Sequence, residues 1–179
     1  VRAFYIIGFP GETVSEMNET FEYAARLGAD WSTFSVASPI PGTEMYDEFV
    51  ELGYIEDGPS SWTGTTIRDR TFDTKEISKK RIKDLAYRAN LSVNFINNVN
   101  IKNGDYENAE IIFKNFIKMY DFHIFAYDCL RRIYKLTEKL KEESAIVDQM
   151  KNLLKSNESS RSFIKYFDLL DRDIATDLK

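Results

Sequence analysis

The sequence predicts an α/β segment followed by an all-α remainder, and two observations carry this prediction. Two hexapeptides rich in Gly and Pro, residues 8–13 and 38–43, each close a short apolar run and open an amphipathic one. From Thr74 onward, apolar residues instead recur at helical spacing. We therefore predict two consecutive βα units with a connecting loop over residues 1–73, and a helical extension over residues 74–179.

The first βα unit begins with a predicted strand at residues 3–7. This run is almost uninterruptedly apolar and rich in β-prone residues, as expected of a parallel strand that is buried on both faces. The turn after it contains two glycines, which allow a sharp bend and close approach to a ligand, and Pro10, which fixes its own φ. A helix should follow, because Thr13 and Glu16 have the spacing of a capping box, and Gly28 is the expected stop.

The second βα unit repeats the same order of signals. Residues 31–37 are predicted to form a strand, and a helical stripe made of Met45, Phe49 and Leu52 follows and ends before Gly53. Two such units imply a parallel sheet, whose strands all end at one edge. The Gly- and Pro-rich turns collect at that edge, where α/β proteins bind their ligands.

The remainder is predicted to be a long connection over residues 54–74 and then five helices. The phrase at residues 104–109 resembles the turn between the helices of a tetratricopeptide repeat, and Ala109 and Ala145 are 36 residues apart. Because that repeat has a period of about 34 residues, we predict an α-hairpin array that is repeat-like. The helices are expected at residues 77–103, from 104, from about 124, around 145–154 and around 163–170.

The two turns also carry a resemblance to a known family. Residues 4–13, followed by residues 34–43 with Tyr46 and Gly53 after them, look like the fifth and sixth βα units of the radical S-adenosylmethionine enzymes. The closest resemblance is to the class with an N-terminal cobalamin-binding domain, which includes anaerobic magnesium-protoporphyrin ester cyclase-like proteins. It covers roughly residues 1–70.

The resemblance implies a fold and a chemistry. The fold would be a partial (β/α)6 TIM-like barrel, of which this chain holds the last two βα units. The cofactors would be S-adenosylmethionine, cleaved reductively on a [4Fe–4S] cluster to give a substrate radical, and cobalamin in the class named above. Trp62, in the long connection, would plug one end of that barrel.

The resemblance also implies where the cofactor would lie. In the family the fifth strand touches the adenine of S-adenosylmethionine and the sixth strand borders the cofactor. This chain departs from the commoner Gly-x-Ile-x-Gly-x-x-Glu form, because Phe4 replaces the first Gly and Glu12 stands one position late. In the alternative interpretation, the Gly and Pro residues of the turns only shape the backbone and do not line a ligand site. The residues that match the cofactor-binding positions are Ile6, Gly8, Phe9, Pro10, Gly11, Glu12, Ser35 and Ser38.

The chain lacks the cluster ligands of the family. Those ligands are the thiolates of a Cys-x3-Cys-x2-Cys motif, whereas this chain has a single cysteine, Cys129, and one isolated thiolate cannot hold such a cluster. We therefore expect a C-terminal piece of a longer enzyme, inactive alone, whose missing N-terminal part is its partner. Cys129 and the only histidine, His123, are expected to be structural, so that no catalytic residue or metal ligand is assigned.

Composition narrows the classes of partner. The net charge of −5 gives no electrostatic footprint for nucleic acid, and no apolar run approaches the ~20 residues of a membrane-spanning helix. One cysteine excludes an internal disulfide framework and fits a reducing compartment. We therefore expect a cytoplasmic protein that acts on a small-molecule substrate.

Two other functions stay open at this stage. In the first, residues 74–179 are a helical adaptor that binds a partner. In the second, the chain is a small α/β enzyme with a phosphate site at the start of the helix that follows Thr13 or Thr43. A sheet of two strands also leaves an unpaired edge near residues 2–8. We expect the chain either to form a homodimer there or to cover the edge with its helices.

Overall fold

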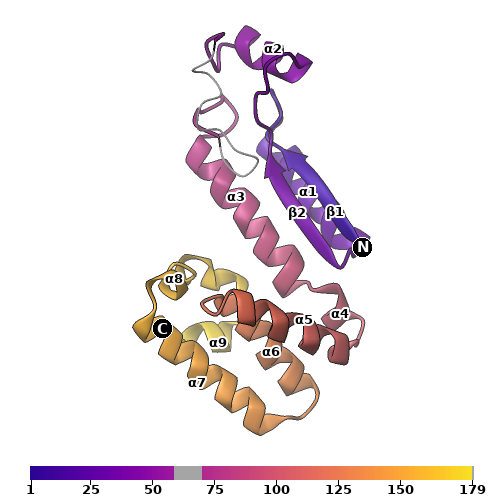
Figure 1. The fold of residues 1–179 in the computed structure, drawn as a ribbon, viewed down its shortest axis with the longest axis vertical. Coiled ribbons are helices and arrows are strands. Elements are labelled where there is room, and N and C mark those ends of the chain that lie inside the picture. Colours follow the sequence, from indigo (N-terminus) through magenta and orange to yellow (C-terminus); the bar gives the residue numbers. More distant parts are fainter. Residues whose placement is uncertain (59–69, 179) are drawn as a thin grey trace. The chain divides into compact units, whose positions relative to one another are not determined.

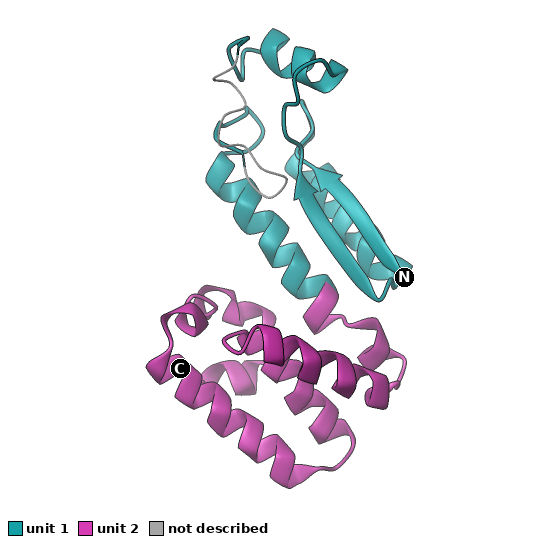
Figure 2. Ribbon diagram, viewed as in Figure 1, with its two compact units in different colours: residues 1–93 teal, residues 94–179 magenta. Residues whose placement is uncertain are grey.

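The computed structural model describes residues 1–58 and 70–178. They form two compact units, residues 1–93 and 94–179 (Figure 2). The division lies later in the chain than the predicted boundary after residue 73, because helix α3 (Lys79–Leu91) packs on the sheet of the first unit. Most of the predicted long connection, with Trp62, lies outside the described residues.

The first unit contains the two predicted βα units (Figure 1). Strands β1 (Arg2–Ile7) and β2 (Trp31–Val36) are parallel, with Arg2 opposite Trp31 and Ile7 opposite Val36. Helix α1 (Val14–Leu27) follows β1 and helix α2 (Glu44–Glu51) follows β2. The strands and their parallel pairing confirm the sequence prediction, whereas closure of this sheet into a partial barrel remains a prediction.

Local signals set the ends of α1. The Thr13 hydroxyl accepts a hydrogen bond from Glu16 N at 3.3 Å, and the Glu16 carboxylate accepts one from Thr13 N at 2.8 Å. This is the predicted capping box, which satisfies two amides that the first turn leaves unpaired. The helix ends at Gly28, whose φ of 66° is the left-handed conformation that a glycine adopts without strain.

Helix α2 is capped in a similar way, but its buried residues match the predicted apolar stripe only in part. The Thr43 hydroxyl accepts a hydrogen bond from Tyr46 N at 3.2 Å. Tyr46 and Phe49 are its buried residues, whereas Leu52, predicted to be part of the apolar stripe, is the C-cap and is exposed. The helix therefore ends at Glu51, one residue before the last residue of the predicted stripe.

Within the described residues of the first unit, helices cover one face of the sheet. On the covered face the Tyr5 ring stacks on Phe34 at 5.2 Å, and both strands pack against apolar side chains of α1 and α3. On the other face Phe4 is 73% exposed and Ile6 is 53% exposed. Strand β1, which was expected to be buried on both faces, is thus buried on one, since no described element of the first unit covers the second face. The apolar residues of the covering helices are Val14, Met17, Phe21, Ala24, Ala25, Ile82, Leu85, Ala86 and Ala89.

The prediction of one long helix over residues 77–103 is wrong. Helix α3 ends at Leu91 and is followed by a π-helical turn (Ser92–Ile96) and the short helix α4 (Val99–Lys102). Asn98 starts the new helix, because its Oδ1 accepts hydrogen bonds from the backbone N–H of Asn100 and Ile101. Its Nδ2 donates to the carbonyl of Asn94, so the side chain competes with a continuous backbone ladder.

The second unit is helical, as predicted. Helices α5 (Tyr106–Met119), α6 (Ile124–Leu136) and α7 (Leu140–Ser156) begin close to the expected positions. Beyond them the single predicted short helix is replaced by α8 (Glu158–Arg161), a 3₁₀ turn (Ile164–Leu169) and α9 (Arg172–Asp177). Ala109 is buried but Ala145 is exposed, so these two residues do not occupy equivalent positions. Among the described residues, every helix is too short or too polar to cross a membrane.

Candidate functional site at the carboxyl edge of the sheet

The two predicted turns lie at the same edge of the sheet. Gly8 directly follows β1, and Ala37, which directly follows β2, donates its N–H to the carbonyl of Ile7 at 2.8 Å. Parallel pairing therefore places both turns beside each other, as the sequence predicted. This edge is the candidate site.

Ile6 and Ser35 are brought together on the uncovered face. They are direct partners across the two strands, one residue pair before the edge. Phe4 and Thr33, the preceding partners on this face, extend the surface along the strands. An apolar side chain and a hydroxyl thus stand side by side on a part of the sheet that the described residues leave open.

The backbone of the first turn is held by Glu12. The Glu12 carboxylate accepts hydrogen bonds from the N–H groups of Gly8 and Phe9, the second at 3.0 Å. Thr13 N, at the start of α1, is bonded to the Glu16 carboxylate. Two carboxylates therefore already lie at this turn and helix start, and their negative charge argues against the phosphate site considered at Thr13.

Gly8 is required by the packing of the chain itself. Its φ is +81°, and a Cβ at this position would collide with the Cδ1 atom of Ile82 in α3. Gly11, with φ +75°, has no heavy atom within 4 Å of the place where a Cβ would be. The space for a ligand is therefore beside Gly11, and Gly8 is closed off by α3.

The other predicted residues have plainer surroundings. Phe9 is exposed and Pro10 is half-buried, and neither side chain has a polar group that could form a hydrogen bond. Ser38 lies just past β2, is half-buried and donates its hydroxyl to the carbonyl of Val36 at 3.2 Å. The structure thus places all eight predicted residues at or beside one edge.

The contact of Arg70 with the first turn was not predicted from the sequence. This side chain is 2% exposed, and its Nη1 donates to the carbonyl of Gly8 at 3.0 Å, 62 positions away along the chain. Burial lowers the pKa of Arg70, although a guanidinium stays charged over the physiological range. No sequence signal pointed to this contact, because Arg70 stands in a loop among other charged residues.

The residues of this chain do not fit the iron–sulfur cluster that the resemblance implies. In the described ranges, 1–58 and 70–178, no three His, Cys, Asp or Glu residues are grouped as metal ligands would be. Cys129, the only cysteine of the chain, is fully buried, and its Sγ donates to the carbonyl of Phe95 at 3.4 Å. Burial raises the pKa of this thiol, which keeps it in the form that does not bind metal.

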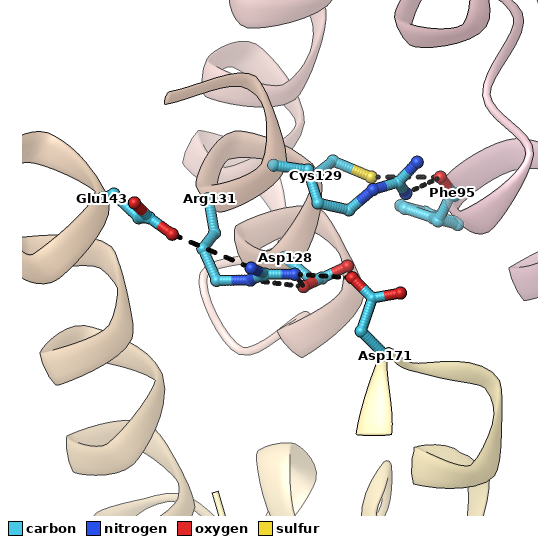
Figure 3. Close-up of polar contacts among 7 residues, drawn as sticks. Phe95, Asp128, Cys129, Arg131, Glu143 and Asp171 are labelled. Carbon is cyan, nitrogen blue, oxygen red and sulfur yellow. Dashed lines mark hydrogen bonds and ion pairs between the residues drawn. The ribbon is translucent and has the colours of Figure 1, made fainter. Parts of the chain in front are cut away.

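A cluster of charged groups in the second unit is paired internally. Arg131 contacts the carboxylates of Asp128 at 2.8 Å, Asp171 at 3.3 Å and Glu143 at 3.9 Å (Figure 3). Asp128 and Arg131 are both buried. Each charge has its partner in place, so the cluster is structural.

A groove of about 520 Å³ lies on the second unit. Two of its lysines, Lys114 and Lys139, are both bonded to Glu110, at 2.6 and 2.9 Å. The Glu110 carboxylate therefore offsets part of the positive charge of both lysines, and the groove offers no strong attraction to a charged partner. Its lining residues are Tyr106, Glu107, Glu110, Ile111, Lys114, Thr137 and Lys139.

Comparison with known proteins finds methyltransferases and a tRNA-modifying synthase. The chain is 30% identical over 88 residues to an uncharacterised methyltransferase of Pyrococcus horikoshii, which covers 49% of this chain and 19% of that protein. It is 36% identical over 62 residues to the cytidylyl-2-hydroxyethylphosphonate methyltransferase of Streptomyces wedmorensis, covering 31% and 12%. It is 40% identical over 47 residues to the tRNA-2-methylthio-N(6)-dimethylallyladenosine synthase of Thermus thermophilus, covering 26% and 10%.

These relatives are matched at low identity and over part of their length. The chain spans less than a fifth of each of the three. No protein-family model matches the chain, and no solved structure does.

Proposed function

We propose that this chain is part of a radical S-adenosylmethionine enzyme and forms one section of its cofactor and substrate wall. The observation that carries the proposal is the sheet with one open face. Helices α1 and α3 cover the side of Tyr5 and Phe34, whereas Phe4 and Ile6 are exposed. Barrels have this arrangement, with helices outside and ligand-facing residues at the carboxyl ends of the strands.

The relatives support the general class. Two of them are named methyltransferases and the third is named for a methylthio product. Such names fit an enzyme that uses S-adenosylmethionine, which is what the resemblance of the two turns implies. None of the three is named a cyclase, so the cyclase-like character and the use of cobalamin depend on that resemblance alone.

The chemistry of the open face suits an adenosine. Ile6 offers an apolar surface to a flat base, and the hydroxyl of Ser35 beside it can donate or accept one hydrogen bond. The bound cofactor would supply the radical chemistry. The residues of this chain would bind and orient it, and the cluster ligands would come from another part of the longer protein.

The test uses the longer protein that carries this chain, reconstituted with iron and sulfide. Ile6→Asp places a charge on the open face and should raise the dissociation constant for S-adenosylmethionine at least tenfold, measured by equilibrium dialysis. Leu27→Asp is the matched control, because Ile6 and Leu27 are both 53% exposed. Equal affinity in the two variants would remove the open face from the cofactor site.

The 179-residue chain by itself gives a second measurement. After the same reconstitution it should retain no stoichiometric iron or acid-labile sulfide, because one buried thiol cannot hold a cluster. A full complement of both in the isolated chain would contradict the assignment of the ligands to another part of the protein.

A further inference from the structure

The first turn is held by charged side chains from both sides. Gly8 donates its N–H to the Glu12 carboxylate and accepts a hydrogen bond on its carbonyl from Arg70 Nη1 at 3.0 Å. Both contacts are charge-assisted hydrogen bonds, which are shorter and stronger than neutral ones. The two polar groups of one glycine are thus fixed by a carboxylate and a guanidinium.

Arg70 is itself fixed by the segment that leads into α3. Its Nη2 donates to the Thr74 hydroxyl and to the carbonyl of Ile77, both at 3.3 Å. Thr74 N also donates to Ile77 O at 3.0 Å, which closes this segment into a turn. The side chain is 2% exposed, so its orientation is set by these contacts.

The same segment supports Gly8 by packing. Ile82, in the first turns of α3, lies directly against the Cα of Gly8. Residues 70–82 therefore hold the first turn by one hydrogen bond and one apolar contact. Nothing in the spacing of the sequence links these two stretches.

We infer that Arg70 is a positioning residue for the candidate site: together with Glu12 it fixes the backbone of the turn at Gly8 and Phe9. This inference rests on the proposed function, because it assigns Arg70 an effect on the ligand that the turn would bind. It also gives Glu12 a role other than ligand contact, since its carboxylate is engaged with the backbone of the turn. Arg70 acts through its hydrogen bond to the carbonyl of Gly8.

The first test is made on the 179-residue chain by amide hydrogen exchange in NMR spectra. Arg70→Met should speed exchange of the Gly8 and Phe9 amides at least tenfold, whereas exchange within α6 should not change. Arg70→Lys keeps a donor and should restore part of the protection. Arg81→Met, at an exposed position of α3, is the matched control.

A second variant tests the same turn in case Arg70→Met does not fold. Glu12→Gln removes the charge but keeps an oxygen acceptor, and should move the Gly8 and Phe9 amide protons upfield, because their hydrogen bonds weaken. Glu22→Gln, at an exposed position of α1, should leave both signals in place. Unchanged Gly8 and Phe9 amides in both Arg70→Met and Glu12→Gln would overturn the inference.

The second test separates this inference from the proposed function. In the longer protein, Arg70→Met should raise the KM for S-adenosylmethionine at least tenfold and change kcat by less than threefold, because the turn would bind the cofactor without touching the reacting atoms. Faster exchange at Gly8 with an unchanged KM would refute the cofactor role of the turn but would leave the positioning role of Arg70 in place. Unchanged exchange with a raised KM would refute that positioning role.

Discussion

His123 is buried among aromatic rings without a partner for one of its nitrogens. Its ring stacks on Phe95 at 4.5 Å and lies 4.6 Å from the ring of Phe163. Within the described residues, Nδ1 has no hydrogen-bond partner. Burial lowers the pKa of His123 to about 4, so the ring is neutral in the folded chain at neutral pH. These surroundings support the structural role expected from the sequence.

The low pKa predicts that acid weakens the second unit. Below pH 6.5 the unfolded chain takes up a proton on His123 that the folded chain does not, down to about pH 4. Since one pKa unit is worth about 1.4 kcal/mol, the loss over this range is on the order of 3 kcal/mol. Urea unfolding at pH 7 and pH 4.5 measures it, and His123→Leu should lose less stability than the wild type. An equal loss in both proteins would contradict this prediction.

Alanine substitution at the two glycines of the first turn should destabilise the chain to different extents. Gly11→Ala should cost about 1 kcal/mol, because φ is positive but the space beside it is open. Gly8→Ala should cost about 2–4 kcal/mol, because the new methyl group also collides with Ile82. Free energies of unfolding from urea titrations compare the two variants. If Gly11→Ala is the more harmful, the packing of α3 against Gly8 is not as described.

At the scale of elements, Arg131 connects three helices of the second unit. It belongs to α6, Glu143 belongs to α7, and Asp171 is the N-cap of α9. Asp128, one turn before Arg131 in α6, is its buried partner. Such a pair is weak evidence of net stabilisation, but removing one member leaves a buried charge alone.

Arg131→Met should therefore destabilise the chain by about 3–5 kcal/mol. Asp171→Ala should cost less than about 1 kcal/mol, because the Asp171 side chain is 75% exposed and its ion pair is screened by water. Replacing Asp128 by Leu together with Arg131→Met should recover most of the loss. Thermal unfolding followed by circular dichroism ranks the three proteins, and a double variant as unstable as Arg131→Met would contradict the explanation.

At the scale of the whole molecule, the sheet has an unpaired edge. Among the described residues the sheet contains β1 and β2 only, so the outer side of β1 has no neighbouring strand. Phe4, at the middle of β1, is 73% exposed. An exposed apolar edge of this kind pairs with another strand when one is available.

The isolated chain should therefore associate into a homodimer through β1. Phe4→Lys should abolish the association, because charge on an edge strand opposes pairing, whereas Met119→Lys on the second unit should not. Sedimentation equilibrium at micromolar concentration measures the mass against the 20.8 kDa of one chain. A wild-type monomer with fast amide exchange from Phe4 to Ile7 would contradict the prediction.

The sequence by itself determined the elements whose signals are local. The capping box of Thr13 and Glu16, the stop at Gly28 and the start of α5 after Asp105 all involve groups a few residues apart. Such signals do not depend on the rest of the fold, because the hydrogen bonds lie within one turn of chain. The placement of the two turns at one edge also followed, since two βα units in sequence imply a parallel sheet.

The tertiary structure decided what depends on contacts between distant residues. The sequence could not show which face of β1 stays open, because from Ala3 to Ile7 both faces are apolar and alternation then gives no preference. It could not show that Arg70 bonds the carbonyl of Gly8 or that Ile82 packs against Gly8. Those contacts arise when α3 packs on the sheet. Packing brings such groups together through burial of apolar surface, which has no fixed spacing along the chain.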